Sequence, residues 1–311
     1  MRLTARQRET IAGYSFLLPN FVGFLAFTSF PVVFSFIIAF FKWDNLRPPE
    51  FVRLSNFSDL MLHTPEFWEW CGNTLFLMLG IPLGMLASLG LALLMNRKLK
   101  GATFFRTIFF LPTATSGVAI LIMWIWIYNP DYGLVNLCIA RFGDAINLIA
   151  STVAGRDAGI SFKGPAWLAS RTWAKPAFIL MGTWTAAGGP TMILYLAGLS
   201  QISPALYEAA DIDGANAWQK FRHVTWPMLA PTTFFILIMG VIGGLQGGVQ
   251  AAYVMTQGGY GTTTIGYAIY NQAFNLLEMG RAAALSWVLF GIVFVVTIVN
   301  WKYGGKVVHY E

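Results

Sequence analysis

Residues 282–301 read AAALSWVLFGIVFVVTIVNW and contain neither a charged side chain nor a proline. A helix needs about 20 apolar residues to cross the hydrocarbon core of a bilayer. The backbone of such a segment must be helical, because lipid offers its N–H and C=O groups no hydrogen-bond partner. This stretch therefore predicts a membrane-spanning helix near the carboxyl end of the chain.

Five more segments have the same character, at about 13–41, 72–95, 107–128, 176–199 and 228–252. Of the 311 residues, 56% are hydrophobic and only 11% are charged, whereas a soluble domain carries about 25% charged residues. We therefore expect one integral membrane domain over residues 1–311, all-α, with six transmembrane helices. The first apolar segment is too long for a signal peptide and is expected to remain as a span.

The basic residues orient these helices, because cytoplasmic loops are enriched in lysine and arginine. With both termini in the cytoplasm, the inner segments carry the whole net charge of +6, and bases balance acids in the outer loops. Topology thus accounts for the positive charge, and no nucleic-acid partner is expected. The inner bases are Arg2, Arg6, Arg8, Arg97, Lys98, Lys100, Arg106, Lys220, Arg222, Lys302 and Lys306.

None of the six predicted spans contains Asp, Glu, Lys, Arg or His. Ionisable groups in a membrane mark proton relays and ion pathways, and catalysis needs titratable groups or metal ligands. The sequence therefore argues against a proton-coupled carrier, a pump, a voltage-gated channel and a membrane enzyme. Gly305-Lys306 lacks the flanking residues of a phosphate-binding loop. We expect no catalytic residue, no metal site and no cofactor.

Uncharged polar residues do occur in the predicted spans. Gln246 and Gln250 are four residues apart in the glycine-rich stretch GGLQGGVQ, so we expect them to share one face of a helix. They could hydrogen-bond to a neighbouring helix or to a polar, uncharged solute. Together with Trp184 they are the candidate lining of a substrate path.

The predicted outer side carries the long loop 129–174 and both cysteines, Cys71 and Cys138. Residues 133–150 have helical apolar spacing. This segment could lie on the membrane surface, pack at the outer mouth of the protein, or contact an external partner. The cysteines could form one disulfide or remain two unpaired thiols.

The loop between the fourth and fifth spans contains EAADIDGANAWQKF at residues 208–221 and is predicted to face the cytoplasm. Ser203-Pro204 favours a helix start, and Asp213-Gly214 favours its end. A second helix is expected over about 215–225, with Pro227 ending it. Small alanines and exposed charges on such a helix pair suit a groove on a soluble protein better than an anionic lipid surface. A calcium loop is not favoured, because the ligand order of an EF-hand is missing.

These residues carry a resemblance to a known family. Glu208-Ala209-Ala210, three residues, Gly214, nine residues and Val224-Thr225-Trp226-Pro227 resemble the EAA loop of ABC importer permeases. FLLPNFVGFLAFTSFPVVFSF, MTQGGYGTTT and MGRAAALSWVLF resemble the sugar-permease branch. The resemblance covers nearly the whole chain. Trp226 stands where leucine is usual, and Tyr260 stands where that branch usually has proline.

The resemblance implies a permease subunit of an ATP-driven carbohydrate importer in a bacterial cytoplasmic (inner) membrane. The implied partners are a homologous second permease subunit, a cytoplasmic ATPase dimer and an extracytoplasmic sugar-binding protein. ATP hydrolysis would take place in the ATPase subunits. The implied coupling residues lie in an EAA loop of about residues 200–227 and are Glu208, Ala209, Ala210, Asp213, Gly214, Ala215 and Phe221. The alternative is a self-contained facilitator or channel for a neutral solute, which leaves the cytoplasmic helix pair unexplained.

Overall fold

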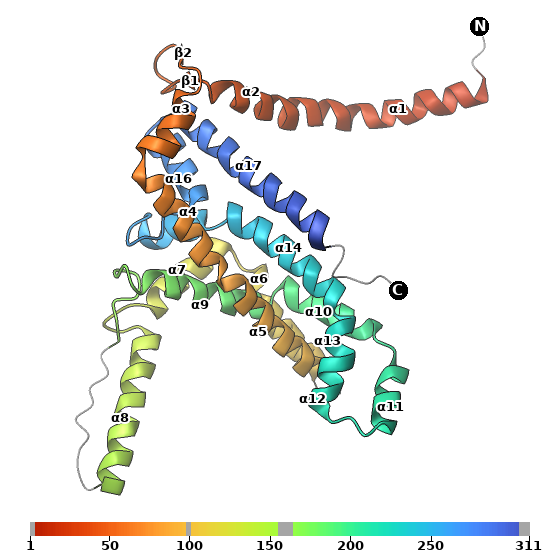
Figure 1. Ribbon diagram of the computed structural model, residues 1–311, viewed down its shortest axis with the longest axis vertical. Coiled ribbons are helices and arrows are strands. Elements are labelled where there is room, and N and C mark those ends of the chain that lie inside the picture. The colour runs from red at the N-terminus through yellow and green to blue at the C-terminus, as the bar shows by residue number, and fades with distance from the viewer. Residues whose placement is uncertain (1–3, 98–100, 155–163, 305–311) are drawn as a thin grey trace. The chain divides into compact units, whose positions relative to one another are not determined.

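The computed structural model describes residues 4–97, 101–154 and 164–304, and helices make up most of this part of the chain (Figure 1). Two compact units share it: unit 1 comprises residues 1–65 and 269–290, and unit 2 comprises residues 66–268 and 291–311. The predicted inner residues Arg2, Lys98, Lys100 and Lys306 lie outside the described residues.

In unit 1 a helical rod leads into a short hairpin. The rod consists of α1 (Ala5–Phe24), a π-helical turn at 25–29 and α2 (Phe30–Ile38), and the strands β1 (Phe41–Lys42) and β2 (Glu50–Phe51) pair antiparallel. Asp44 Oδ1 accepts hydrogen bonds from the backbone N–H groups of Leu46 and Arg47 in the turn. These two bonds hold the pKa of the Asp44 carboxyl below its usual range.

Unit 1 also contains α3 (Ser55–Ser58), π-helical turns at 59–63 and 271–275, and the first part of α17 (Met279–Gly304). Asn56 Nδ2 donates to the carbonyl oxygens of Ala39 and Phe41, both at 2.9 Å. Trp287 Nε1 of α17 donates to Ser35 Oγ of α2 at 3.2 Å. Gly280 lies so close to the hairpin that an added Cβ would be 1.8 Å from the Phe41 carbonyl oxygen.

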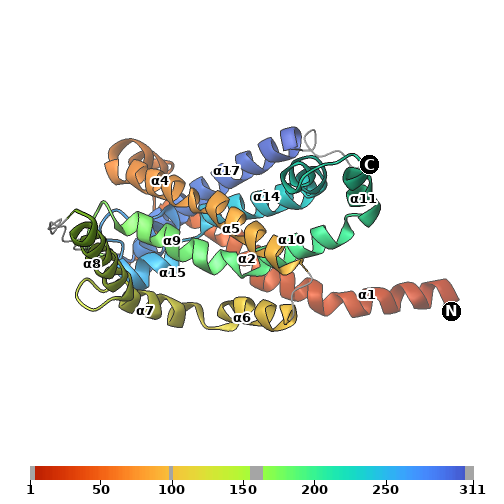
Figure 2. The same cartoon turned by 90° about the horizontal axis from the view of Figure 1, so that it is seen from below.

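Unit 2 is built around α5, which packs against α9, α10 and α14 (Figure 2). Its buried core includes Leu89 and Ala92 of α5, Tyr195 of α10 and Ile236 of α14. Ser88 Oγ of α5 contacts the carbonyl oxygen of Ala186 in α9 at 2.7 Å. The helices of unit 2 are α4 (Pro65–Met78), α5 (Gly80–Met95), α6 (Ala102–Ala114), α7 (Gly117–Ile127), α8 (Leu134–Ala154), α9 (Ala174–Ala187), α10 (Pro190–Gln201), α11 (Pro204–Ile212), α12 (Ala217–Lys220), α13 (Trp226–Met228), α14 (Ala230–Gln246), α15 (Val249–Ala251) and α16 (Ile265–Tyr270), the last running into unit 1.

Within the described residues, 4 helices are long and apolar enough to cross a membrane, or up to 7 spans result if each bent helix pair counts as one. The helices are 5–38, 65–95, 134–152 and 279–300, and the bent pairs cover 104–127, 174–201 and 217–246. Each of the six predicted segments overlaps one of these candidates. The remaining candidate, 134–152, lies in the loop that was expected outside, where helical spacing was predicted.

Three predicted spans differ from single straight helices. Residues 107–128 divide at Thr115 and Ser116, whose extended backbone turns α6 from α7 by 98°. α9 and α10 meet at Gly188-Gly189 with a bend of 43°. The predicted helix over 228–252 ends at Gln246, because Gly247 is extended; Gly248 follows with a φ of +85°, a left-handed conformation that glycine adopts without steric cost.

Candidate functional site

The loop that carries the predicted coupling residues folds into a capped helix and a sharp turn. Ser203 caps α11 by accepting the N–H of Ala205, with Pro204 at the first helical position, as predicted. At the other end Gly214 has a φ of +73°. The N–H groups of Gly214 and Ala215 donate to the carbonyl oxygens of Asp211 and Ala210. This is the Schellman arrangement, in which a left-handed residue ends the helix.

The second arm begins two residues later than predicted. Asn216 caps α12, and its side chain and that of Gln219 each accept the other's backbone N–H, which forms a capping box. The arm then runs through a π-helical turn at 221–225 into α13. The expectation that Pro227 ends this arm is wrong: the helix includes Pro227, and the chain bends by 63° only at Leu229. Pro227 follows the π-helical turn and stands at the start of α13, where a missing N–H is tolerated.

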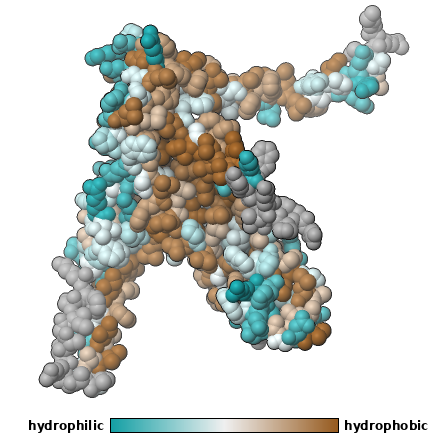
Figure 3. All heavy atoms as spheres, in the orientation of Figure 1, coloured by the Kyte–Doolittle hydropathy of each residue, from teal (hydrophilic) through white to brown (hydrophobic). Residues whose placement is uncertain are grey.

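Two side-chain contacts hold the arms together, so that α11 and α12 lie side by side (Figure 1). The Tyr207 hydroxyl is 2.9 Å from Thr225 Oγ1. Lys220 Nζ forms an ion pair with Asp211. We refer to residues 203–228 as the α11–α12 hairpin. Its hydrophilic residues gather at one end of unit 2, next to an apolar surface (Figure 3).

The predicted coupling residues do not all face outward. Glu208, Ala209, Asp213 and Gly214 are exposed, whereas Ala210, Ala215 and Phe221 are half-buried. The Phe221 ring stacks on Trp218, with centroids 5.5 Å apart, and packs against the core of unit 2. Phe221 therefore anchors the α11–α12 hairpin to the core of unit 2.

Two apolar residues on the hairpin were missed by sequence reasoning. Ile212 is 87% exposed and Trp218 is 65% exposed. Both flank the turn at Gly214, and large apolar side chains at a prominent tip suit a contact with another protein. Their position next to the Asp213-Gly214 turn was the available signal.

The three candidate path residues are exposed, but they do not share a helix. Gln246 is the last residue of α14, and Gln250 lies in α15, beyond the break at Gly248. The prediction that the two glutamines share one helical face is therefore wrong. Gln250 Oε1 lies 3.3 Å from where a Cβ on Gly117 would be. Trp184 packs edge-on against Trp124, with ring centroids 5.6 Å apart.

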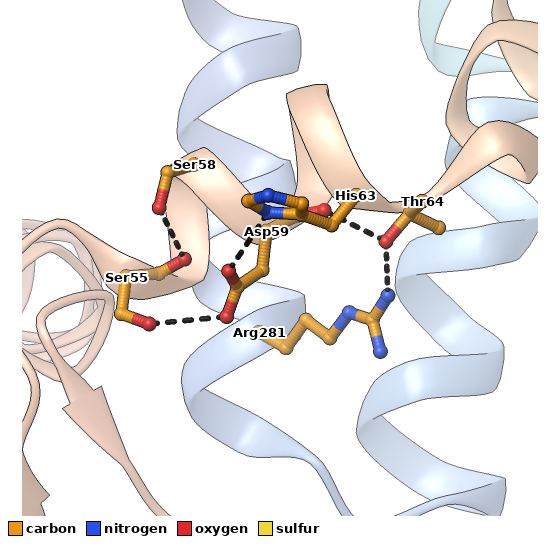
Figure 4. A network of polar contacts seen from close by, with 6 residues as sticks. All are labelled: Ser55, Ser58, Asp59, His63, Thr64 and Arg281. Carbon is orange, nitrogen blue, oxygen red and sulfur yellow. Dashed lines mark hydrogen bonds and ion pairs between the residues drawn. The ribbon is translucent and has the colours of Figure 1, made fainter.

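Two of the cavities differ in the chemistry of their linings. One, of about 610 Å³, is lined almost wholly by apolar residues of α4, α5, α9, α10 and α14 in unit 2. The other, of about 890 Å³, lies in unit 1 and is lined by both acids and bases. In this cleft Asp59 contacts Ser55 and His63, and Arg281 Nη2 donates to Thr64 Oγ1 at 2.7 Å (Figure 4). The first lining offers few hydrogen-bonding groups, whereas the second offers many.

Both cysteines are free, so the predicted alternative of two unpaired thiols is confirmed. In the described part of the chain, no group of at least 3 His, Cys, Asp or Glu side chains could hold a metal ion.

The sequence model of the family described as "Binding-protein-dependent transport system inner membrane component" matches residues 80–301. The chain belongs to this family. It is thus an inner-membrane permease component of an ABC transport system, a class whose ATPase is a separate subunit.

Curated relatives align over nearly the whole chain. The probable ABC transporter permease protein YesP of Bacillus subtilis is 32% identical over 98% of this chain and 94% of its own length. The trehalose/maltose transport system permease protein MalF of Thermococcus litoralis is 32% identical over 96% of this chain and 95% of its own length. The fold is similar to a chain of a bacterial ABC transporter involved in the import of the acidic polysaccharide alginate, with a TM-score of 0.77, 26% identity, and coverage of 95% of this chain and 97% of that one.

Proposed function

We propose that this chain is the permease subunit of an ATP-driven carbohydrate importer, with six spans and both termini in the cytoplasm. The observation that carries the proposal is the α11–α12 hairpin, an exposed and internally capped element in a chain of the permease family. A facilitator would have no use for such an element. Related permeases are named for arabinooligosaccharides and for trehalose and maltose, which supports a carbohydrate substrate.

The chain forms half of the translocation path, and a homologous permease subunit forms the other half. An extracytoplasmic sugar-binding protein delivers the substrate, and a similar structure is of an alginate transporter in complex with a pentasaccharide-bound periplasmic protein. A cytoplasmic ATPase dimer receives the hairpin in a groove. Glu208 and Asp213 supply charge to that contact, and the small side chain of Ala209 allows the groove to approach closely.

ATP binding closes the ATPase dimer and draws the two hairpins of the permease pair together. The hairpin transmits this movement because its arms are joined by the Tyr207–Thr225 and Lys220–Asp211 contacts. The bend at Leu229 connects it to α14, which ends at Gln246. Movement of the hairpin is thereby passed to α14 and to the candidate path residue at its end, Gln246.

Co-purification from mild detergent tests the assembly. We expect an ATPase to accompany the tagged protein, and the substitutions Glu208→Ala and Gly214→Pro to weaken its attachment or to uncouple its activity. Exchange of the exposed Gln201 for alanine, at the end of α10, serves as the matched control. A protein that purifies without an ATPase and lets sugar leak down its gradient in vesicles would instead establish the facilitator.

Alanine at Gln246 or Gln250 is expected to raise the KM for uptake about tenfold, because each loses a hydrogen bond to the substrate worth about 1–1.5 kcal/mol. Assembly with the ATPase should persist, since both side chains are exposed. Uptake of radiolabelled sugar into vesicles measures the effect, and Gln201→Ala again serves as the control. Unchanged kinetics in both variants would remove the two residues from the path.

A further inference from the structure

Unit 2 contains another cavity, whose lining differs in chemistry from those of the two cavities described above. It has a volume of about 370 Å³ and lies between the turn after α7, the segment 166–169 and the residues that follow α15. Its lining contains no charged side chain but includes Tyr128, Asn129, Trp167, Gln257 and Tyr260. Aromatic surfaces combined with amides and a hydroxyl suit a polar, uncharged ligand, and the volume falls within the range of about 300–1,000 Å³ usual for small-molecule sites.

The aromatic side of this cavity is held in place by hydrogen bonds. Trp167 is 9% exposed, and its indole N–H donates to Asn136 Oδ1 at 2.7 Å. Asn136 Nδ2 in turn donates to the carbonyl oxygens of Pro130 and Pro165. The Tyr128 ring lies beside Trp167, with centroids 5.6 Å apart. The indole plane is thus fixed before any ligand arrives.

The opposite side is a loop in an uncommon backbone conformation. Gln257 and Tyr260 have φ values of +52° and +55°, a region in which residues other than glycine are strained by about 1–3 kcal/mol. Threonine hydroxyls hold the loop: Thr256 Oγ1 and Thr262 Oγ1 are 2.5 Å apart, and Thr263 Oγ1 donates to the Gly258 carbonyl oxygen at 2.6 Å. Strain that the surroundings maintain is characteristic of ligand-binding positions.

Several polar groups of the lining remain available. Among the described residues, none hydrogen-bonds to the side-chain amide of Gln257 or to the hydroxyl of Tyr260. Asn129 Oδ1 accepts from the backbone N–H groups of Asp131 and Tyr132, which points its amide nitrogen to other partners. Two of these groups sit on the strained loop, so the strain presents them to the cavity.

We propose that this cavity binds one ring of an uncharged carbohydrate, packed against the ring of Tyr260, which is 48% exposed, and hydrogen-bonded by Gln257, Tyr260 and Asn129. The proposal rests on the proposed function and adds a second contact point, separate from the candidate path residues.

The test is saturation-transfer NMR with maltose, lactose and trehalose as probes, on the complete transporter in detergent without its binding protein. Tyr260→Ala and Gln257→Ala are expected to lower the transfer signal about fivefold, because each loses one aromatic or hydrogen-bonding contact. Alanine bears a backbone strain at these positions similar to that of the native residues, so the loop should keep its conformation. Tyr260→Phe and Gln257→Asn should retain more of the signal than the alanine variants.

The matched control is Tyr132→Ala, which removes a tyrosine that is 65% exposed and does not line the cavity. Its signal should equal that of the wild type. Equal signals in all variants, with uptake intact, would overturn the carbohydrate site and leave the importer standing. A wild-type transporter that neither imports nor contacts any of the three sugars would instead count against the proposed function itself.

Discussion

Gly214→Pro is expected to abolish transport while the subunit still assembles in the membrane. Gly214 ends α11 with a φ of +73°, and proline cannot adopt a positive φ. Proline also removes the N–H that donates to the Asp211 carbonyl oxygen. The turn must then open, and Ile212 and Trp218 lose their common position at the tip. Vesicle uptake and ATPase activity, measured together, should show hydrolysis that no longer drives import.

Two variants make this experiment specific. Gly214→Asn should retain a larger part of transport, because asparagine tolerates the left-handed conformation better than most residues. Gly101→Pro provides the matched control, since Gly101 also has a positive φ of +80° and nothing within 4 Å of an added Cβ, but lies in another loop. If both proline variants reduce transport equally, the defect is one of folding. Normal transport by Gly214→Pro would refute the role of the hairpin.

Gly280→Ala is expected to destabilise unit 1 by about 3 kcal/mol, the upper part of the usual range for inserting atoms into a close-packed site. The added Cβ would lie 1.8 Å from the Phe41 carbonyl oxygen and 3.2 Å from Asn56 Nδ2. A backbone carbonyl cannot move aside as the end of a side chain could, so the β1–β2 hairpin must separate from α17. The midpoint of thermal denaturation in detergent should fall by several degrees.

The control for this substitution lies on the same helix. Gly291 of α17 has nothing within 4 Å of an added Cβ, so Gly291→Ala should be neutral or slightly stabilising, because alanine favours helices. Comparable stability of the two variants would mean that the β1–β2 hairpin does not pack against Gly280 as described.

The sequence predicted the features that depend on local chemistry. Long uncharged runs identified the helical segments, because composition over about 20 residues is enough to recognise a candidate span. Ser203-Pro204 and Asp213-Gly214 located both ends of α11, since capping depends on a few adjacent residues. The family followed from the spacing of the EAA loop, and its model matches residues 80–301.

Features that depend on one or two backbone angles could not be predicted from the sequence. The spacing of Gln246 and Gln250 in GGLQGGVQ predicted one shared helical face, but the extended Gly247 and the left-handed Gly248 separate the two residues. Thr115 and Ser116 carry no helix-breaking signal of their own, yet their extended backbone separates α6 from α7. The aromatic cavity joins residues about 130 positions apart, from Tyr128 to Tyr260, and only the tertiary fold brings them together.

The caps and cross-links of the α11–α12 hairpin also bear on the speed of each transport cycle. Ordering a flexible loop on contact would cost about 1–2 kcal/mol for every backbone residue immobilised. The Schellman turn, the capping box and the Lys220–Asp211 pair already hold the α11–α12 hairpin in one conformation before it contacts the ATPase. Binding and release of the ATPase can therefore follow nucleotide turnover as a rigid-body event, without a folding step that would have to be repeated for every molecule carried.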